Sequence, residues 1–168
     1  MSRSLPGTRG HAHRPSATAT ITSDDHGHTW HRGEIAGPST AEWVNPNETV
    51  VVQFADGRVM LNSRSESARH RRLVTISSDG ATGWSQPSFD ATLVEPICMT
   101  GIVRVHPPEG DTPGLIAFSN PDNLGRRDGR HTPGLSRDRV NVTVRLSDDA
   151  GKPGRPVARS SRAGILAA

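Results

Sequence analysis

Short runs of apolar and β-branched residues alternate with stretches rich in Gly, Pro, Asp and Asn along most of the chain. Runs of about four to eight residues with a period of two are typical of β-strands. They predict strands at 17–22, from Trp30 onward, and at 49–54, 58–63, 73–77, 101–105, 115–119 and 140–147. The 17 Gly and 13 Pro residues also suit short strands joined by turns better than long helices. We therefore expect an all-β fold built as a repeated meander of antiparallel strands.

Asp56 and Gly57 separate two of these runs, 49–54 and 58–63. An Asp-Gly pair between apolar runs predicts a β-hairpin with a tight type I′ turn. Glu48 precedes the first run and Arg64 follows the second. Because the strands of a hairpin are antiparallel, these two side chains are expected at the same end of the sheet.

One turn motif occurs three times. The pattern Ser-x-Asp-x-Gly-x-Thr-Trp, an Asp box, is complete at 23–30, through Ser23, Asp25, Gly27, Thr29 and Trp30. A degraded copy at 77–84 keeps Ser77, Asp79 and Trp84, and a third at 147–154 keeps Ser147, Asp149 and Gly151. In such a turn Ser and Asp accept backbone N–H bonds, Gly permits positive φ, and Trp packs beneath the hairpin. The three aspartates are therefore expected to be structural, with one copy per four-stranded blade of a β-propeller.

Charge and composition exclude several other classes of protein. The formal charge is +3 and the sequence pI is about 10.3, but the cationic residues are scattered or lie in the segment 153–168. A chain with three Trp, three Phe and no Tyr offers few aromatic rings for base stacking, so a nucleic-acid partner is not expected. No apolar run is long enough for a transmembrane helix or a signal peptide.

The remaining polar features give few candidate sites. Cys98 is the only cysteine, and the default interpretation is a buried small side chain. The His-x-His pairs at 11–13 and 26–28 lack a third ligand at a suitable spacing, so neither a metal site nor a cofactor is expected. Residues 1–16 are expected to be loop or disordered, 17–152 to form the blades, and 153–168 to be an atypical basic tail.

Three segments resemble exo-sialidases of the bacterial type. Residues 47–64 run Asn-Glu, then the hairpin with Asp-Gly at its turn, then Asn-Ser-Arg, as in that family. Phe118-Ser119-Asn120-Pro121 and the segment 139–145, Arg-Val-Asn-Val-Thr-Val-Arg, resemble two more of its motifs. The resemblance implies a six-bladed sialidase-type β-propeller, of which this chain supplies the middle blades. It places Glu48 as the catalytic base and Arg64 and Arg139 in the arginine triad, whereas Arg145 is expected to point away from the pocket.

The residue types fit the substrate that the resemblance implies, a sialylated oligosaccharide, glycoprotein or ganglioside. Sialic acid carries a carboxylate on its anomeric carbon, and guanidinium groups bind carboxylates with fixed, often bidentate geometry. Sialidases use a tyrosine nucleophile in a retaining reaction, and a neutral phenol approaches such a substrate without charge repulsion. Glu48 would deprotonate that phenol.

This sequence departs from the family in four respects. It has no tyrosine, no N-terminal arginine motif and no recognisable acid aspartate, and the third Asp box loses its Thr and Trp. We therefore expect an incomplete and inactive exo-α-sialidase, truncated or changed in reading frame near Lys152. The alternative is a non-catalytic Asp-box propeller that binds carbohydrate or another protein. Such a scaffold needs the Asp boxes but not Glu48, Arg64 and Arg139 together. The sequence does not indicate a cellular compartment.

Overall fold

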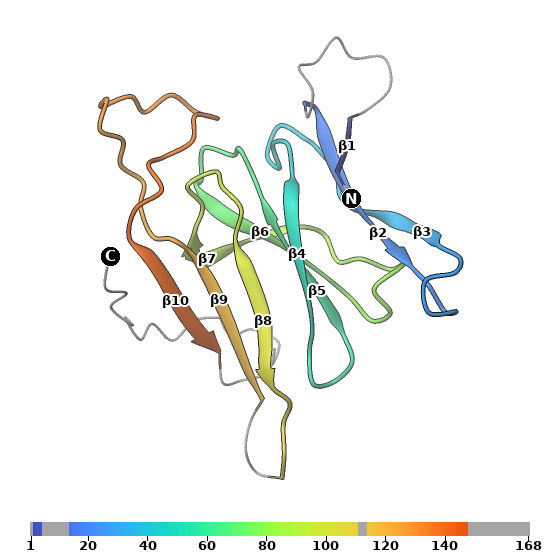
Figure 1. Ribbon diagram of the computed structural model, residues 1–168. Coiled ribbons are helices and arrows are strands. Elements are labelled where there is room, and N and C mark those ends of the chain that lie inside the picture. Colours follow the sequence, from blue (N-terminus) through green and yellow to red (C-terminus); the bar gives the residue numbers. More distant parts are fainter. Residues whose placement is uncertain (1, 5–13, 111–113, 148–168) are drawn as a thin grey trace.

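The computed structural model describes residues 2–4, 14–110 and 114–147 as strands and loops (Figure 1). The ten strands are β1 (Ser2–Ser4), β2 (Ser16–Thr22), β3 (His31–Gly37), β4 (Asn47–Gln53), β5 (Val59–Arg64), β6 (Arg71–Ser77), β7 (Ser88–Val94), β8 (Gly101–His106), β9 (Leu115–Pro121) and β10 (Val142–Ser147). No helix occurs in this part of the chain. The predicted all-β class is confirmed.

The strands form three antiparallel sheets that follow one another along the chain. Their orders are β1-β2-β3, β4-β5-β6-β7 and β8-β9-β10. The sheets stand side by side like a fan, with β4 next to β8 on one side and next to β1 and β2 on the other (Figure 1). β4, the first strand of the second sheet, therefore lies between β8 of the third sheet and β1 and β2 of the first, as expected for blades arranged around an axis.

Apolar side chains fill the space between the second and third sheets. Val52, Phe54, Met60 and Ile116 form a buried cluster, with Ile102 and two residues of β6 packed against it. Burying a side chain of this size stabilises a fold by about 1.5–3 kcal/mol relative to leaving it exposed. The first and second sheets meet at Gly33, where an added Cβ would lie 2.6 Å from the carbonyl oxygen of Ala81. Only glycine allows that approach.

The first Asp box turns the chain from β2 to β3. The Asp25 carboxylate accepts bonds from the Thr29 amide (2.8 Å), the Thr29 hydroxyl (2.6 Å) and the Ser23 hydroxyl (2.8 Å). Ser23 Oγ accepts from the Gly27 amide at 2.7 Å. Trp30 does not pack beneath the hairpin as predicted: it is 58% exposed and its Nε1 donates to the Gly27 carbonyl at 3.0 Å. The indole therefore closes over its own turn.

The second Asp box joins β6 to β7 with a turn that is one residue shorter between Asp and Thr. The Asp79 carboxylate accepts from the amides of Ala81 (2.8 Å) and Thr82 (2.7 Å) and from the Thr82 hydroxyl (2.6 Å). Gly80 supplies the positive φ, at +75°. The ring of Trp84 is half-buried. Of the third copy only Ser147 lies in the described part of the chain, so Asp149 and the segment 153–168 fall outside it.

Asp25 gives a pH-dependent prediction. The hydrogen bonds from Thr29 and then from Ser23 lower the pKa of Asp25 to about 2. Because the folded-state pKa is depressed, this stabilisation is present above the unfolded value, near 4, and is lost as the pH falls towards 2. Asp25→Asn keeps one acceptor but loses the charge. We expect thermal melts to show the variant less stable at pH 6, with the difference disappearing near pH 2.

Local structure differs from the expectation in three further places. Residues 2–4, within the segment 1–16 that was expected to be loop or disordered, form β1, whose backbone pairs with β2. The turn at Asp56-Gly57 is not type I′, because only Gly57 has a positive φ (+88°) and the Phe54 amide donates to Arg58 O at 2.7 Å. This closes a three-residue loop with Gly57 left-handed, the next commonest hairpin connection. The strand β7 was not predicted at all.

Candidate functional site

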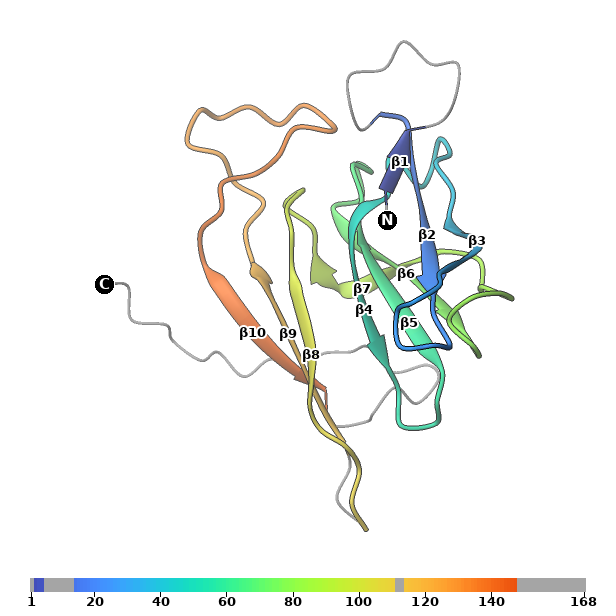
Figure 2. The same ribbon diagram turned by 45° about the vertical axis from the view of Figure 1, so that its right-hand side comes forward.

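One end of the sheets gathers the residues that the sequence singled out. Glu48 lies at the start of β4, Arg64 at the end of β5, and Arg139 three residues before β10. The antiparallel order places these positions at the same end of the second and third sheets, which we call the site end. Both described Asp boxes lie at the other end of the sheets, where β2 and β6 end (Figure 2).

Glu48 sits in a β-bulge. Asn47 pairs with Arg64, but the next aligned pair is Val50 with Asn62, so Glu48 and Thr49 face Ser63 alone. Glu48 has a φ of +38°, a left-handed conformation that is unusual for a residue with a side chain. Bulges and such backbone conformations often re-aim side chains at functional sites. Here the Glu48 carboxylate lies 3.6 Å from Arg64 Nε.

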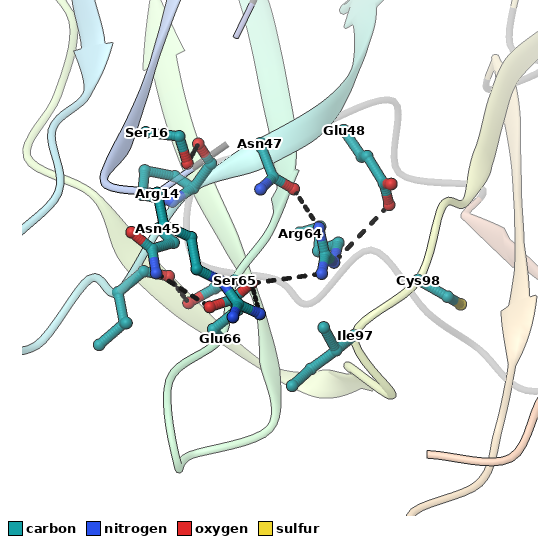
Figure 3. Close-up of polar contacts among 12 residues, drawn as sticks. Arg14, Ser16, Asn45, Asn47, Glu48, Arg64, Ser65, Glu66, Ile97 and Cys98 are labelled. Carbon is teal, nitrogen blue, oxygen red and sulfur yellow. Dashed lines mark hydrogen bonds and ion pairs between the residues drawn. The ribbon is translucent and has the colours of Figure 1, made fainter. Parts of the chain in front are cut away.

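The Arg64 guanidinium is held by neighbours on both sides (Figure 3). Nη1 donates to Asn47 Oδ1 at 2.7 Å, and Nη2 lies 3.4 Å from Glu66 Oε1. The Arg64 side chain is only 16% exposed. Its position is therefore fixed before any ligand arrives.

Glu66 connects Arg64 to a second arginine that sequence reasoning missed. Its carboxylate is only 4% exposed, and Oε1 accepts from Arg14 Nε (3.0 Å) and Nη2 (2.8 Å). Oε2 accepts from Asn45 Nδ2 at 2.9 Å. Arg14 belongs to no recognisable motif, and Glu66, two residues after Arg64, looks like an ordinary loop acid in the sequence. No signal in the sequence alone could have found this cluster.

A buried ion pair supports the loop 95–100 beside the site. Arg72 and Glu95 are both fully buried and paired with each other. Arg72 also donates to Asn62 Oδ1 at 2.6 Å, while Glu95 Oε1 accepts from the amides of Ile97 (2.6 Å) and Cys98 (3.0 Å). Burial raises the pKa of Glu95 and lowers that of Arg72, because both charged forms lose water. This network fixes Ile97 and Cys98, which Figure 3 shows on the Glu48 side of Arg64, away from Glu66.

The charges of Glu48 and Arg139 both influence the Cys98 thiol. Burial is the main cause that raises the pKa of the Cys98 thiol, and the carboxylates of Glu95 and Glu48 raise it further. The guanidinium of Arg139 opposes this effect. Glu48 and Arg139 therefore shift the pKa of this thiol in opposite directions. Arg139 itself is exposed, and none of the described residues forms an ion pair with it.

Arg145 lies elsewhere. It is buried on β10, donates to Asn120 Oδ1 at 3.0 Å and pairs with Asp122 at 2.8 Å. Asn120 in turn donates to the Val94 carbonyl at 2.6 Å. The Phe-Ser-Asn-Pro motif thus joins the third sheet to the end of β7, and Arg145 belongs to this structural contact.

His70 links two loops at the site end and gives a second prediction. Its Nε2 accepts from Arg137 Nη2 at 2.8 Å, so Nδ1 must carry the proton that faces the Glu95 carbonyl at 3.3 Å. Burial, and then the charge of Arg137, lower the pKa of His70. The neutral form is favoured on folding, so stability is lost as the pH falls from about 6.5 through the lower folded-state value.

We therefore expect His70→Gln to reduce the loss of unfolding free energy between pH 7 and pH 5, because glutamine can accept the Arg137 bond without titrating. Urea unfolding at several pH values measures this. The matched control is His31→Gln, which changes an exposed histidine of β3. An equally steep pH dependence in His70→Gln and wild type would contradict the assignment.

Within the described residues, no three His, Cys, Asp or Glu side chains gather as metal ligands would. His11 and His13 lie outside those residues. The same part of the chain contains no helix long and apolar enough to cross a membrane.

Successive antiparallel sheets of three or four strands, two of which have an Asp-box turn between their last two strands, define the blades of an Asp-box β-propeller. Residues 4–157 match the BNR repeat-like domain family. The chain belongs to this family, within the bacterial sialidases that carry BNR repeats.

One curated relative and two solved structures are similar to this chain. The sialidase of Micromonospora viridifaciens is 32% identical over 136 residues, which are 79% of this chain and 18% of the relative. The Trypanosoma rangeli sialidase, solved as a covalent intermediate with 2,3-difluorosialic acid, has a TM-score of 0.53 and 26% identity, covering 80% of this chain and 20% of its own.

The Streptococcus pneumoniae sialidase NanB shares the fold at 18% identity, with a TM-score of 0.54 over 84% of this chain and 20% of its own. The chain thus spans about a fifth of the length of the relatives that it matches. The sialidase β-propeller predicted from the motifs is confirmed as its fold.

Proposed function

We propose that this chain carries part of the sialic acid site of an exo-α-sialidase, with Arg64 and Arg139 as ligands of the substrate carboxylate and Glu48 as the catalytic base. The observation that carries the proposal is the Arg64 guanidinium, which is held in place by Asn47 and Glu66 and lies 3.6 Å from the Glu48 carboxylate. The relative from Trypanosoma rangeli holds a sialic acid derivative covalently, which supports the ligand class.

The two arginines suit a carboxylate for different reasons. Arg64 is preorganised, so binding costs little side-chain entropy. Arg139 is exposed and lacks an ion-pair partner among the described residues, so its charge is available to a ligand. A planar carboxylate between two guanidinium groups would gain charge-assisted hydrogen bonds from both.

Glu48 would act on the nucleophile of a retaining reaction. In that reaction an oxygen nucleophile bonds to the anomeric carbon as the glycosidic bond breaks, and water later displaces the nucleophile with net retention. A carboxylate next to a phenol would take its proton during attack. These 168 residues contain no tyrosine, so the proposal for this chain is sialoside binding without turnover.

Two measurements test the proposal. Titration of ¹⁵N-labelled protein with free sialic acid is expected to shift the amide signals of Glu48, Arg64 and Arg139. A fluorogenic sialoside is expected to release no product above background. Unchanged amide signals at millimolar sialic acid would overturn the site. Product release that Glu48→Gln abolishes would instead show that the chain needs no added nucleophile.

A further inference from the structure

Arg139 lies on a long loop, residues 122–141, that runs from β9 to β10. Its side chain is exposed, and none of the described residues forms an ion pair with it. Hydrogen bonds within the loop, such as the one from the Asp138 amide to the Gly125 carbonyl (3.0 Å), give the loop its shape. They do not fix its place relative to Arg64, so the position of Arg139 at the site end needs another cause.

Arg137, two residues before Arg139, connects this loop to the rest of the site end. It is buried, with 5% of its surface exposed. Its amide donates to the Pro96 carbonyl at 2.8 Å, and its Nη2 donates to His70 Nε2, also at 2.8 Å. In the described part of the chain, no other hydrogen bond joins this loop to the two loops that carry His70 and Pro96. The place of Arg139 therefore depends on Arg137.

His70 has an unusual backbone conformation at this contact. Its φ is +50°, in the left-handed region that residues with a side chain rarely adopt. The Glu95 amide donates to the His70 carbonyl at 3.0 Å, and His70 Nδ1 faces the Glu95 carbonyl at 3.3 Å. These two contacts leave His70 Nε2 to accept from Arg137. Such backbone conformations persist where the surroundings over-determine them, and they are frequent at functional sites.

We propose that His70 is a positioning residue for the carboxylate site: through Arg137 it holds the loop that carries Arg139, an inference that rests on the proposed function. A guanidinium only donates hydrogen bonds, so His70 can bind Arg137 only while Nε2 carries no proton. Protonation of His70 would remove this bond and set two cations against each other. The loop would then have to be ordered when the ligand binds, which lowers the affinity.

The groups around His70 favour its neutral form. Burial, and then the charge of Arg137 from the loop before β10, lower the pKa of His70, and the charge of Arg71 on β6 lowers it further. The bond with the backbone carbonyl of Glu95 acts in the opposite direction. The carboxylate of Glu95 is paired with Arg72. The contact is therefore intact at pH 7 and is lost as the pH falls below the ordinary histidine value, about 6.5, through the lower folded-state value.

The first test measures sialic acid affinity by NMR titration at pH 7 and pH 5. Wild type is expected to lose about three- to tenfold of its affinity at pH 5, the effect of one lost hydrogen bond. His70→Ala should show the same loss already at pH 7. His70→Gln can accept from Arg137 without titrating, so it should bind like wild type at pH 7 and keep that affinity at pH 5. His31→Ala, which changes an exposed histidine of β3, is the matched control and should follow wild type at both pH values.

A second test separates positioning of Arg139 from a general effect on the fold. If His70 acts through Arg139, His70→Ala should cost little further affinity in a protein that already carries Arg139→Ala. Nitrogen-15 relaxation of the ligand-free proteins gives a readout without sialic acid. His70→Ala is expected to lower the order parameters of the amides 137–141, and His70→Gln should leave them as in wild type.

The outcomes distinguish this inference from the proposed function. If His70→Ala weakens binding equally with and without Arg139, or if His70→Gln is as pH-dependent as wild type, the positioning role is overturned and the proposed function stands. If wild type binds no sialic acid at either pH, the proposed function is overturned, and unchanged order parameters in His70→Ala would overturn the positioning role as well. Should His70→Ala fail to fold, the comparison of wild type with His70→Gln across pH still decides.

Discussion

Replacing Glu95 with alanine is expected to lower the free energy of unfolding by about 3–5 kcal/mol, since it leaves a buried guanidinium without its carboxylate. Arg72 is fully enclosed, so water cannot replace the lost partner. The same change frees the amides of Ile97 and Cys98, which both donate to Glu95 Oε1. Urea unfolding followed by circular dichroism measures the loss.

Two further variants separate the buried charge from a general effect of losing a glutamate. Glu109→Ala changes an exposed glutamate after β8 and is expected to cost less than about 0.5 kcal/mol. The double variant Arg72→Met with Glu95→Leu removes both charges and should cost much less than Glu95→Ala. A loss below about 1 kcal/mol in Glu95→Ala would show that the pair is not sealed from water.

Strands in which apolar and polar residues alternate could be predicted from the sequence, because one face of such a strand is buried and the other faces solvent. The predicted 115–119 and 140–147 correspond to β9 and β10, within three residues at every end. The strand β7 was not predicted because its pairing with β6 is irregular. Asp90 accepts bonds from the Thr92 amide (2.8 Å) and the Leu93 amide (3.0 Å), which places a turn within the strand. The pairing with β6 shifts there, so no period of two survives.

In the candidate site, too, some residues could be predicted from the sequence and others could not. Glu48 and Arg64 could be expected at one end because a hairpin fixes the relation of its two strands. Glu66 and Arg14 could not, since 52 residues separate them and only the docking of the first sheet on the second brings them together. Arg72 and Glu95 were also missed, because charged residues are expected at the surface and become core residues only as a pair.

Arg64→Gln is expected to weaken sialic acid binding roughly 30-fold or more, corresponding to about 2 kcal/mol or more for the loss of a buried, charge-assisted contact. The fold should survive, because Glu66 keeps Arg14 and Asn45 as partners. Arg64→Lys keeps the charge but not the planar fork, so it should bind with intermediate affinity. NMR titration with sialic acid measures all three proteins.

Arg58→Gln is the matched control for this prediction, since Arg58 lies at the opposite end of β5 and pairs with Asp56. It removes an arginine from the same hairpin and should leave sialic acid binding unchanged. If Arg64→Gln and Arg58→Gln bind sialic acid equally well, the affinity does not come from the guanidinium at the bulge. Equal weakening in both would show instead that net positive charge, and not a shaped site, attracts the ligand.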